Sequence, residues 1–140
     1  MIANVPKTVV TYLLEYLRRK HAYQGIDLVL ARPAGPELAA DQRGEEELMP
    51  FPVLDACFHL FAGEKLAPAE IADALTAMFP EIPKEVVRDH VERFVRLFLG
   101  SIYKWVQSPI SLHMGNLDLE RERALQLPVV TSREWVCSRR

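Results

Sequence analysis

Apolar residues recur every three or four positions in several separate stretches of the chain, which predicts amphipathic helices. The first stretch follows Asn4, a residue type that caps helices, and Pro6, whose missing N–H costs nothing at a helix start. It ends in Arg18, Arg19 and Lys20, whose charges suit the negative end of a helix dipole. The sequence therefore predicts a first helix between Pro6 and Lys20, with an apolar side made of Val9, Val10, Leu13, Leu14 and Leu17.

Three further helices are predicted, from Pro52 to about Ala62, from about Pro68 to Phe79 and from Pro83 to about Val106. Each has a proline at or near its start, where the residue is tolerated. We expect their apolar faces to be buried against one another as helical hairpins. In chain order these faces comprise Val53, Leu54, Cys57, Phe58 and Phe61; Ile71, Ala74, Leu75 and Met78; and Val87, Val91, Phe94, Phe98 and Ile102.

The chain between Gly25 and Pro50 breaks the helical pattern with repeated prolines and glycines. This composition predicts a long loop, with Ile26 to Leu30 as an extended stretch at its beginning. A loop of that length inside a compact domain is expected to be functional. After Pro109 the chain alternates only weakly through Ile110, Leu112 and Met114, and no element is assigned to it.

Composition narrows the classes of partner. The chain has 140 residues, 49% of them hydrophobic, and a formal net charge of −2 with both signs interspersed, so it has no basic field for nucleic acid. Charges interrupt every apolar stretch, which excludes a membrane span and indicates a soluble, cytoplasmic protein. The cysteines, Cys57 and Cys137, are expected to be reduced thiols, and no clustered Cys or His suggests a metal site.

No self-contained active site is visible. The sequence lacks a glycine-rich phosphate loop, a nucleophile elbow and an HExxH motif. His59 and His90 lie among apolar helix positions and are read as core or boundary residues. Cys57 is read as a small hydrophobe in an apolar stripe. The four residues Phe58, Phe61, Phe94 and Phe98 are read as core or subunit interface rather than as a cofactor site.

Three segments, in this order, resemble the NAD⁺ synthetases. The first is Asn4-Val5-Pro6-Lys7-Thr8. The second runs from Pro33 through Glu37-Leu38, Asp41-Gln42 and Glu45-Glu46-Glu47 to Leu48-Met49-Pro50-Phe51-Pro52-Val53-Leu54-Asp55, and the third is Ser101-Ile102-Tyr103-Lys104-Trp105. The three segments occur in the same order as in the family, over about residues 2 to 130. This shared order makes the resemblance more specific than any one segment does.

The resemblance implies a fold and a place in a larger protein. It implies a mainly α chain that forms the helical C-terminal portion of an α/β adenine-nucleotide hydrolase-like (ATP pyrophosphatase) domain. Residues 1–130 would belong to that domain, with a lid loop at about 32–50, and residues 131–140 would form a tail. The parallel sheet and the phosphate loop would lie upstream of Met1, so the chain alone would be inactive. A homodimer is expected.

The resemblance also implies a reaction. ATP, with Mg²⁺, adenylates the nicotinate carboxylate of deamido-NAD⁺, and ammonia, free or released from glutamine, then displaces AMP. Lys7 would contact the ATP phosphates and Lys104 the substrate carboxylate, while Glu37, Asp41 and Glu45 would face the substrate from the lid. Thr8 and Trp105 would also bind substrate. The metal ligands are expected outside this chain.

Two departures from the family pattern leave an alternative open. Arg43-Gly44-Glu45 stands where the family usually has Thr-Asp-Glu, and Lys104-Trp105 where it often has Lys-Arg. The chain could instead be a non-catalytic helical dimerisation or interaction module derived from that family, or a free-standing dimerisation domain. On residue type alone, Lys7 and the Glu45 to Glu47 run would be solvated surface charges, and Lys104 would extend from a buried helix end.

Overall fold

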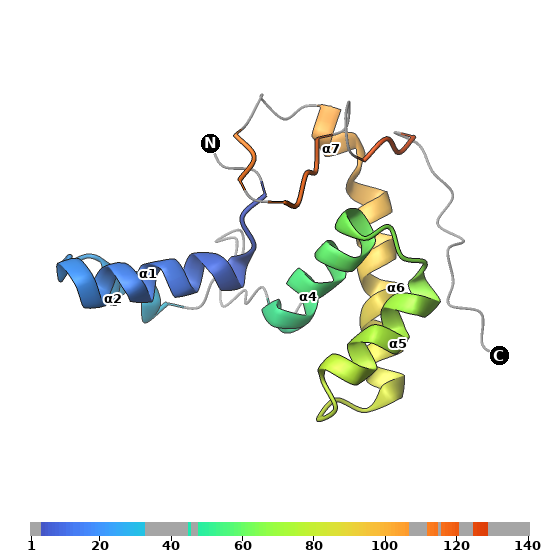
Figure 1. Cartoon of the computed structure of the whole chain (residues 1–140), viewed down its shortest axis with the longest axis horizontal. Helices are drawn as coiled ribbons and strands as arrows, with labels where there is room; N and C mark the ends of the chain where they lie inside the picture. The colour runs from blue at the N-terminus through green and yellow to red at the C-terminus, as the bar shows by residue number, and fades with distance from the viewer. Residues whose placement is uncertain are drawn as a thin grey trace. The chain divides into compact units, whose positions relative to one another are not determined.

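The computed structural model describes residues 4–32, 45, 48–106, 112–114, 116–120 and 125–128. These residues are mainly helical, as predicted, and no β-strand occurs among them (Figure 1). The chain divides into two units, one of Val5–Asp55 and one of Met1–Asn4 together with Ala56–Arg140.

Helix α6 (Lys84–Ser101) supplies the largest apolar face of the second unit. Its buried residues follow the predicted helical spacing and are Val87, Val91, Phe94, Val95, Phe98 and Leu99. Helix α5 (Pro68–Met78) runs beside α6 and buries Ile71 and Leu75 (Figure 1). Glu70 accepts the Ala67 N–H at 2.7 Å, which satisfies a backbone donor at the start of α5. The predicted helical hairpin is therefore present.

Helix α4 (Phe51–Phe58) continues directly into a π-helix, η1 (His59–Gly63). Phe58 and Phe61, from these two elements, meet Phe94 and Phe98 of α6. Ring centroids are 5.1 Å apart for Phe58 and Phe94 and 5.2 Å apart for Phe61 and Phe98, with edge-on geometry in both pairs. Edge-on contacts suit the charge distribution of aromatic rings. Of the two readings left open for these phenylalanines, the structure supports a core.

Asn4 has a different role from the predicted helix cap. It is buried, donates from Nδ2 to the Met114 carbonyl at 2.7 Å and to the Leu117 carbonyl, and accepts the Met114 N–H at 2.7 Å. The N-cap position of the first helix is held by Pro6 instead. The prediction was wrong because the same amide that caps a helix can also pair with a distant backbone, and sequence spacing does not distinguish the two.

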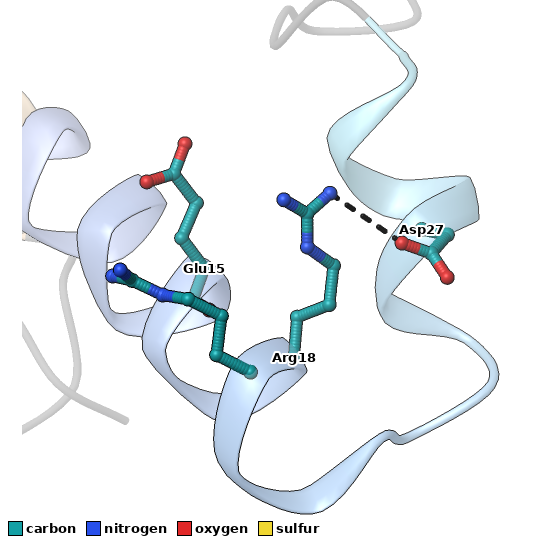
Figure 2. Close-up of polar contacts among 4 residues, drawn as sticks. Glu15, Arg18 and Asp27 are labelled. Carbon is teal, nitrogen blue, oxygen red and sulfur yellow. Dashed lines mark hydrogen bonds and ion pairs between the residues drawn. The ribbon is translucent and has the colours of Figure 1, made fainter.

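The first unit contains α1 (Lys7–His21) and α2 (Ile26–Leu30), which lie side by side (Figure 1). Figure 2 shows the Arg18 guanidinium of α1 directed at Asp27 of α2, with an N–O distance of 3.5 Å. Both side chains are largely exposed, so this pair contributes little stability. Between the helices Ala22 takes a left-handed conformation, with φ of 49°, and its N–H bonds the Arg18 carbonyl.

The prediction of an extended stretch at Ile26 to Leu30 was wrong, because these residues form α2. An extended strand needs a neighbouring strand for its backbone groups, whereas a helix satisfies them locally. Here the Val29 and Ala31 N–H groups bond the carbonyls of Gly25 and Asp27. The side chain of Ile26 is buried, although α1 itself buries no residue.

Two details of the other predicted helices also differ. The last helix is interrupted at Ile102, so that α6 is followed by a separate short helix, α7 (Tyr103–Val106). Met78, expected in the core, is 55% exposed at the C-terminal end of α5. No described helix is long and apolar enough to cross a bilayer. Cys137 and the predicted tail, residues 131–140, lie outside the described residues.

Replacing Phe94 by alanine should remove ring contacts with three other phenylalanines and lower the free energy of unfolding by about 3–5 kcal/mol. Leu97, on the same helix but 41% exposed, is the matched control, and Leu97→Ala should cost about 1 kcal/mol or less. Urea unfolding followed by circular dichroism measures both. Equal losses for the two variants would show that the phenylalanine cluster is not the core.

Burial raises the pKa of the Cys57 thiol to about 12. Because burial favours the neutral thiol, its contribution to stability is complete below the ordinary pKa of 9.0 and is lost as the pH rises towards 12. In a Cys137→Ser variant, a thiol reagent at mildly alkaline pH should react with Cys57 only after denaturation. Rapid labelling of the native protein would contradict this burial.

Candidate functional site

The first turn of α1 carries two of the residues singled out by the sequence, Lys7 and Thr8. Its N-cap residue, Pro6, provides no side-chain acceptor, so the first amide N–H groups of the helix need partners from elsewhere. Pro6 contributes only its carbonyl, which accepts the Val10 N–H at 3.0 Å. The start of α1 therefore depends on a residue distant in sequence.

Asp55, on α4, supplies the missing acceptor. Its Oδ2 atom accepts the backbone N–H of Thr8 at 2.8 Å and the Thr8 hydroxyl at 2.6 Å. Thr8 and Asp55 are 47 positions apart and belong to the same unit. A carboxylate that accepts an N–H in the first turn of a helix also stabilises the positive end of its dipole. Asp55 thus acts as the N-terminal cap of α1 from another helix.

Sequence reasoning placed Asp55 inside a motif but gave it no role. Capping residues are recognised by their position next to the helix that they cap, and this one lies 47 positions away. The available signal was indirect, since Pro6 leaves the first turn of α1 without a side-chain acceptor. Only the fold of the unit shows which carboxylate fills that need.

Lys7, the first residue of α1, is exposed. Its backbone carbonyl accepts the Thr11 hydroxyl at 3.1 Å, but no carboxylate of a described residue lies within ion-pair distance of its ammonium group. Lys84 makes a useful comparison, because it also follows a proline as the first residue of a helix. The Lys84 ammonium is 3.8 Å from the Asp73 carboxylate. Lys7 is therefore the better placed of the two to bind an added anion.

Of the three proposed lid carboxylates, only Glu45 is among the described residues, and Glu37 and Asp41 lie outside them. Glu45 is exposed, and its Oε1 atom accepts the Phe51 N–H at the start of α4, at 2.9 Å. One oxygen of this side chain is therefore used to satisfy a helix N-terminus. The contact joins Glu45 to the helix that carries Asp55.

Lys104 and Trp105 lie in α7, in the unit that does not contain Lys7. The Lys104 side chain is exposed, with its Nζ atom 6.0 Å from the centroid of the Tyr103 ring, which is within reach of a cation–π interaction. Of Trp105 only the backbone is described.

The two helical histidines differ from each other. His90 is half-buried, and its pKa is lowered by burial and by the nearby Arg93 charge, with Asp89 opposing the shift. His59 is exposed, 3.5 Å from the Glu64 carboxylate, so it is a surface residue. Among the described residues, no three His, Cys, Asp or Glu side chains group so as to hold a metal ion.

Comparison of the chain with protein-family models finds no match, and comparisons with curated proteins and with solved structures find none either.

Replacing Asp55 by alanine should leave the Thr8 N–H without its acceptor. Loss of a cap costs about 0.5–2 kcal/mol, so this amide should exchange with solvent roughly ten times faster than in the unmodified chain. Thr11→Val, which removes a hydroxyl bonded only within α1, is the matched control and should leave the Thr8 amide protected. Amide hydrogen exchange by NMR measures this, and an unchanged rate in Asp55→Ala would refute the capping role.

Proposed function

We propose that the chain is the C-terminal helical part of an NAD⁺ synthetase. The observation that carries this proposal is the pair of hydrogen bonds between Thr8 and Asp55. Thr8 belongs to the first segment that resembles the family, and Asp55 ends the second. The resemblance rests on the order of the segments along the chain, whereas the pairing is a contact in space. The contact brings the first two of these segments together in space, which supports reading them as parts of one site.

The geometry around this pair suits the role proposed for Lys7. A group that neutralises phosphate charge during adenylation has to be exposed, cationic and held in place before the substrate arrives. Lys7 is exposed, and its neighbour Thr8 is held through two hydrogen bonds. No described carboxylate competes for its ammonium group. These properties support Lys7 as a phosphate contact.

The proposed reaction proceeds in two steps. The nicotinate carboxylate of deamido-NAD⁺ attacks the α-phosphorus of ATP, which forms an acyl adenylate and releases pyrophosphate. The lone pair of ammonia then attacks the acyl carbon, AMP leaves with the electrons of the carbon–oxygen bond, and a proton is lost to give the amide. Lys104 would contact the substrate carboxylate, and Trp105 would complete its binding, whereas both donors of Thr8 are already bonded to Asp55. A lid at about residues 32–50, with Glu37, Asp41 and Glu45, would exclude water that hydrolyses the adenylate.

The rest of the catalytic apparatus is assigned to an upstream part of the same polypeptide. The resemblance to the family would put the metal ligands and the phosphate loop in that part. The nitrogen donor is free ammonia or glutamine. We further propose a cytoplasmic homodimer, as in the family that the chain resembles.

One observation favours the second candidate, a non-catalytic interaction module. Helix α1 buries no residue, and several of its large apolar side chains are exposed, namely Val9, Tyr12, Leu13 and Tyr16. Exposed apolar side chains on one helix are typical of a surface that another protein covers. In the synthetase proposal the remainder of the α/β domain would provide that cover. The two candidates therefore differ in chemistry and agree that α1 has a partner.

The synthetase proposal is tested with the full polypeptide that contains these 140 residues. It should form NAD⁺ from deamido-NAD⁺, Mg-ATP and either ammonia or glutamine, with release of AMP and pyrophosphate. Lys7→Ala should lower kcat/KM for ATP, and Lys104→Ala should lower kcat/KM for deamido-NAD⁺, each by roughly a hundredfold or more, as expected for loss of a charge that stabilises the transition state.

Lys84→Ala is the matched control, because Lys84 is the first residue of a helix after a proline, as Lys7 is in α1. This variant should keep kcat/KM close to that of the unmodified enzyme. A folded parent protein that makes no NAD⁺ from either nitrogen donor would refute the synthetase proposal. The interaction module would then become the preferred function.

A further inference from the structure

We propose that Asp55 is a positioning residue for this reaction, which holds Lys7 in place through Thr8. The inference rests on the proposed function, because it needs Lys7 to contact ATP. Asp55 itself is not proposed to touch the substrate. Its effect would pass entirely through the first turn of α1.

The hydrogen bonds fix both the backbone and the side chain of one residue. The Thr8 N–H and the Thr8 hydroxyl reach the same carboxylate oxygen, at 2.8 and 2.6 Å. One bond to the backbone alone would leave the turn able to rotate about it, whereas two bonds from different parts of one residue restrict that rotation. Thr8 is half-buried, so water competes poorly for these donors.

Lys7 lies between two restrained residues. On one side Pro6 has its φ angle restricted by the ring, here to −59°, and on the other side Thr8 is bonded to Asp55. The Lys7 backbone therefore has little freedom, and only its side-chain rotamers remain to be ordered when a phosphate binds. Such preorganisation lowers the cost of reaching the transition state.

The charge of Asp55 gives the arrangement a second consequence. A helix N-terminus attracts anions through its free N–H groups and the helix dipole. In α1 the Asp55 carboxylate already occupies this end. A phosphate bound near the start of α1 would therefore be recognised by the Lys7 side chain rather than by the N–H groups at the end of the helix. This predicts that the hydrogen bonds of Asp55, and not its charge, support catalysis.

The experiment uses the full enzyme and a double-mutant cycle. Asp55→Ala should lower kcat/KM for ATP roughly ten- to a hundredfold, as a misplaced catalytic group does. Asp55→Asn keeps an oxygen that can accept both Thr8 donors and should retain kcat/KM to within about threefold. In a Lys7→Ala background, Asp55→Ala should cause no further loss, because a residue that acts only through Lys7 has nothing left to position.

Asp73→Ala is the matched control, since it removes a carboxylate beside the comparable Pro-Lys helix start of α6, and it should leave the kinetics unchanged. If Asp55→Ala fails to fold, Thr8→Val replaces it in the cycle, because it removes one of the two bonds with little change in shape and should lower kcat/KM by roughly threefold.

The outcomes separate this inference from the proposed function. An unmodified enzyme that makes no NAD⁺ refutes both. If the unmodified enzyme is active, three results refute the positioning role alone. These are full activity of Asp55→Ala, impairment of Asp55→Asn as large as that of Asp55→Ala, and multiplication of the losses from Lys7→Ala and Asp55→Ala. Rescue by asparagine together with no additional loss in the Lys7→Ala background supports it.

Discussion

Burial of one face of α6 is the constraint on which the larger unit depends. The helix presents an uninterrupted line of apolar side chains to its neighbours, and α5 and η1 are held by covering that line. Aromatic rings strengthen the packing, because each buried ring removes roughly 150–250 Å² from water and adds a directional edge-on contact. The outward side of α6 is charged, and this division between faces determines how the helix is oriented.

Hydrophobic periodicity predicted this part of the fold well. Val87, Val91 and Phe94 are buried where the spacing of three or four residues predicts. The same reasoning was wrong at Met78, because the side chain lies at the end of α5 beyond the cover of its neighbours. It was also wrong for Ile26 to Leu30, where a run too short for a clear period forms a helix by satisfying its backbone locally. Periodicity shows which side of a helix is apolar. It does not show how far along the helix neighbouring elements pack against that side.

The candidate site was less predictable, because its determining contact is not local. Lys7 and Thr8 were found from a motif, but nothing near them indicates that Asp55 receives both Thr8 donors. Asn4 shows the same limit of sequence analysis. Its residue type and position predict a local helix cap, but its side chain pairs with the backbone of Met114. Short polar side chains can serve a neighbouring turn or a distant one with equal chemistry, and only the packing of the surrounding helices decides between these partners.

The π-helix after α4 has a consequence for how this chain should be aligned with any relative. A π-turn holds one residue more than an α-turn, so removal of a single residue from η1 would leave the spacing of an ordinary α-helix. A relative that lacks this residue would continue as an ordinary α-helix and would need a gap between Phe58 and Leu66. An ungapped alignment would shift the register at this point, and residues that occupy equivalent positions in the two cores would no longer be compared.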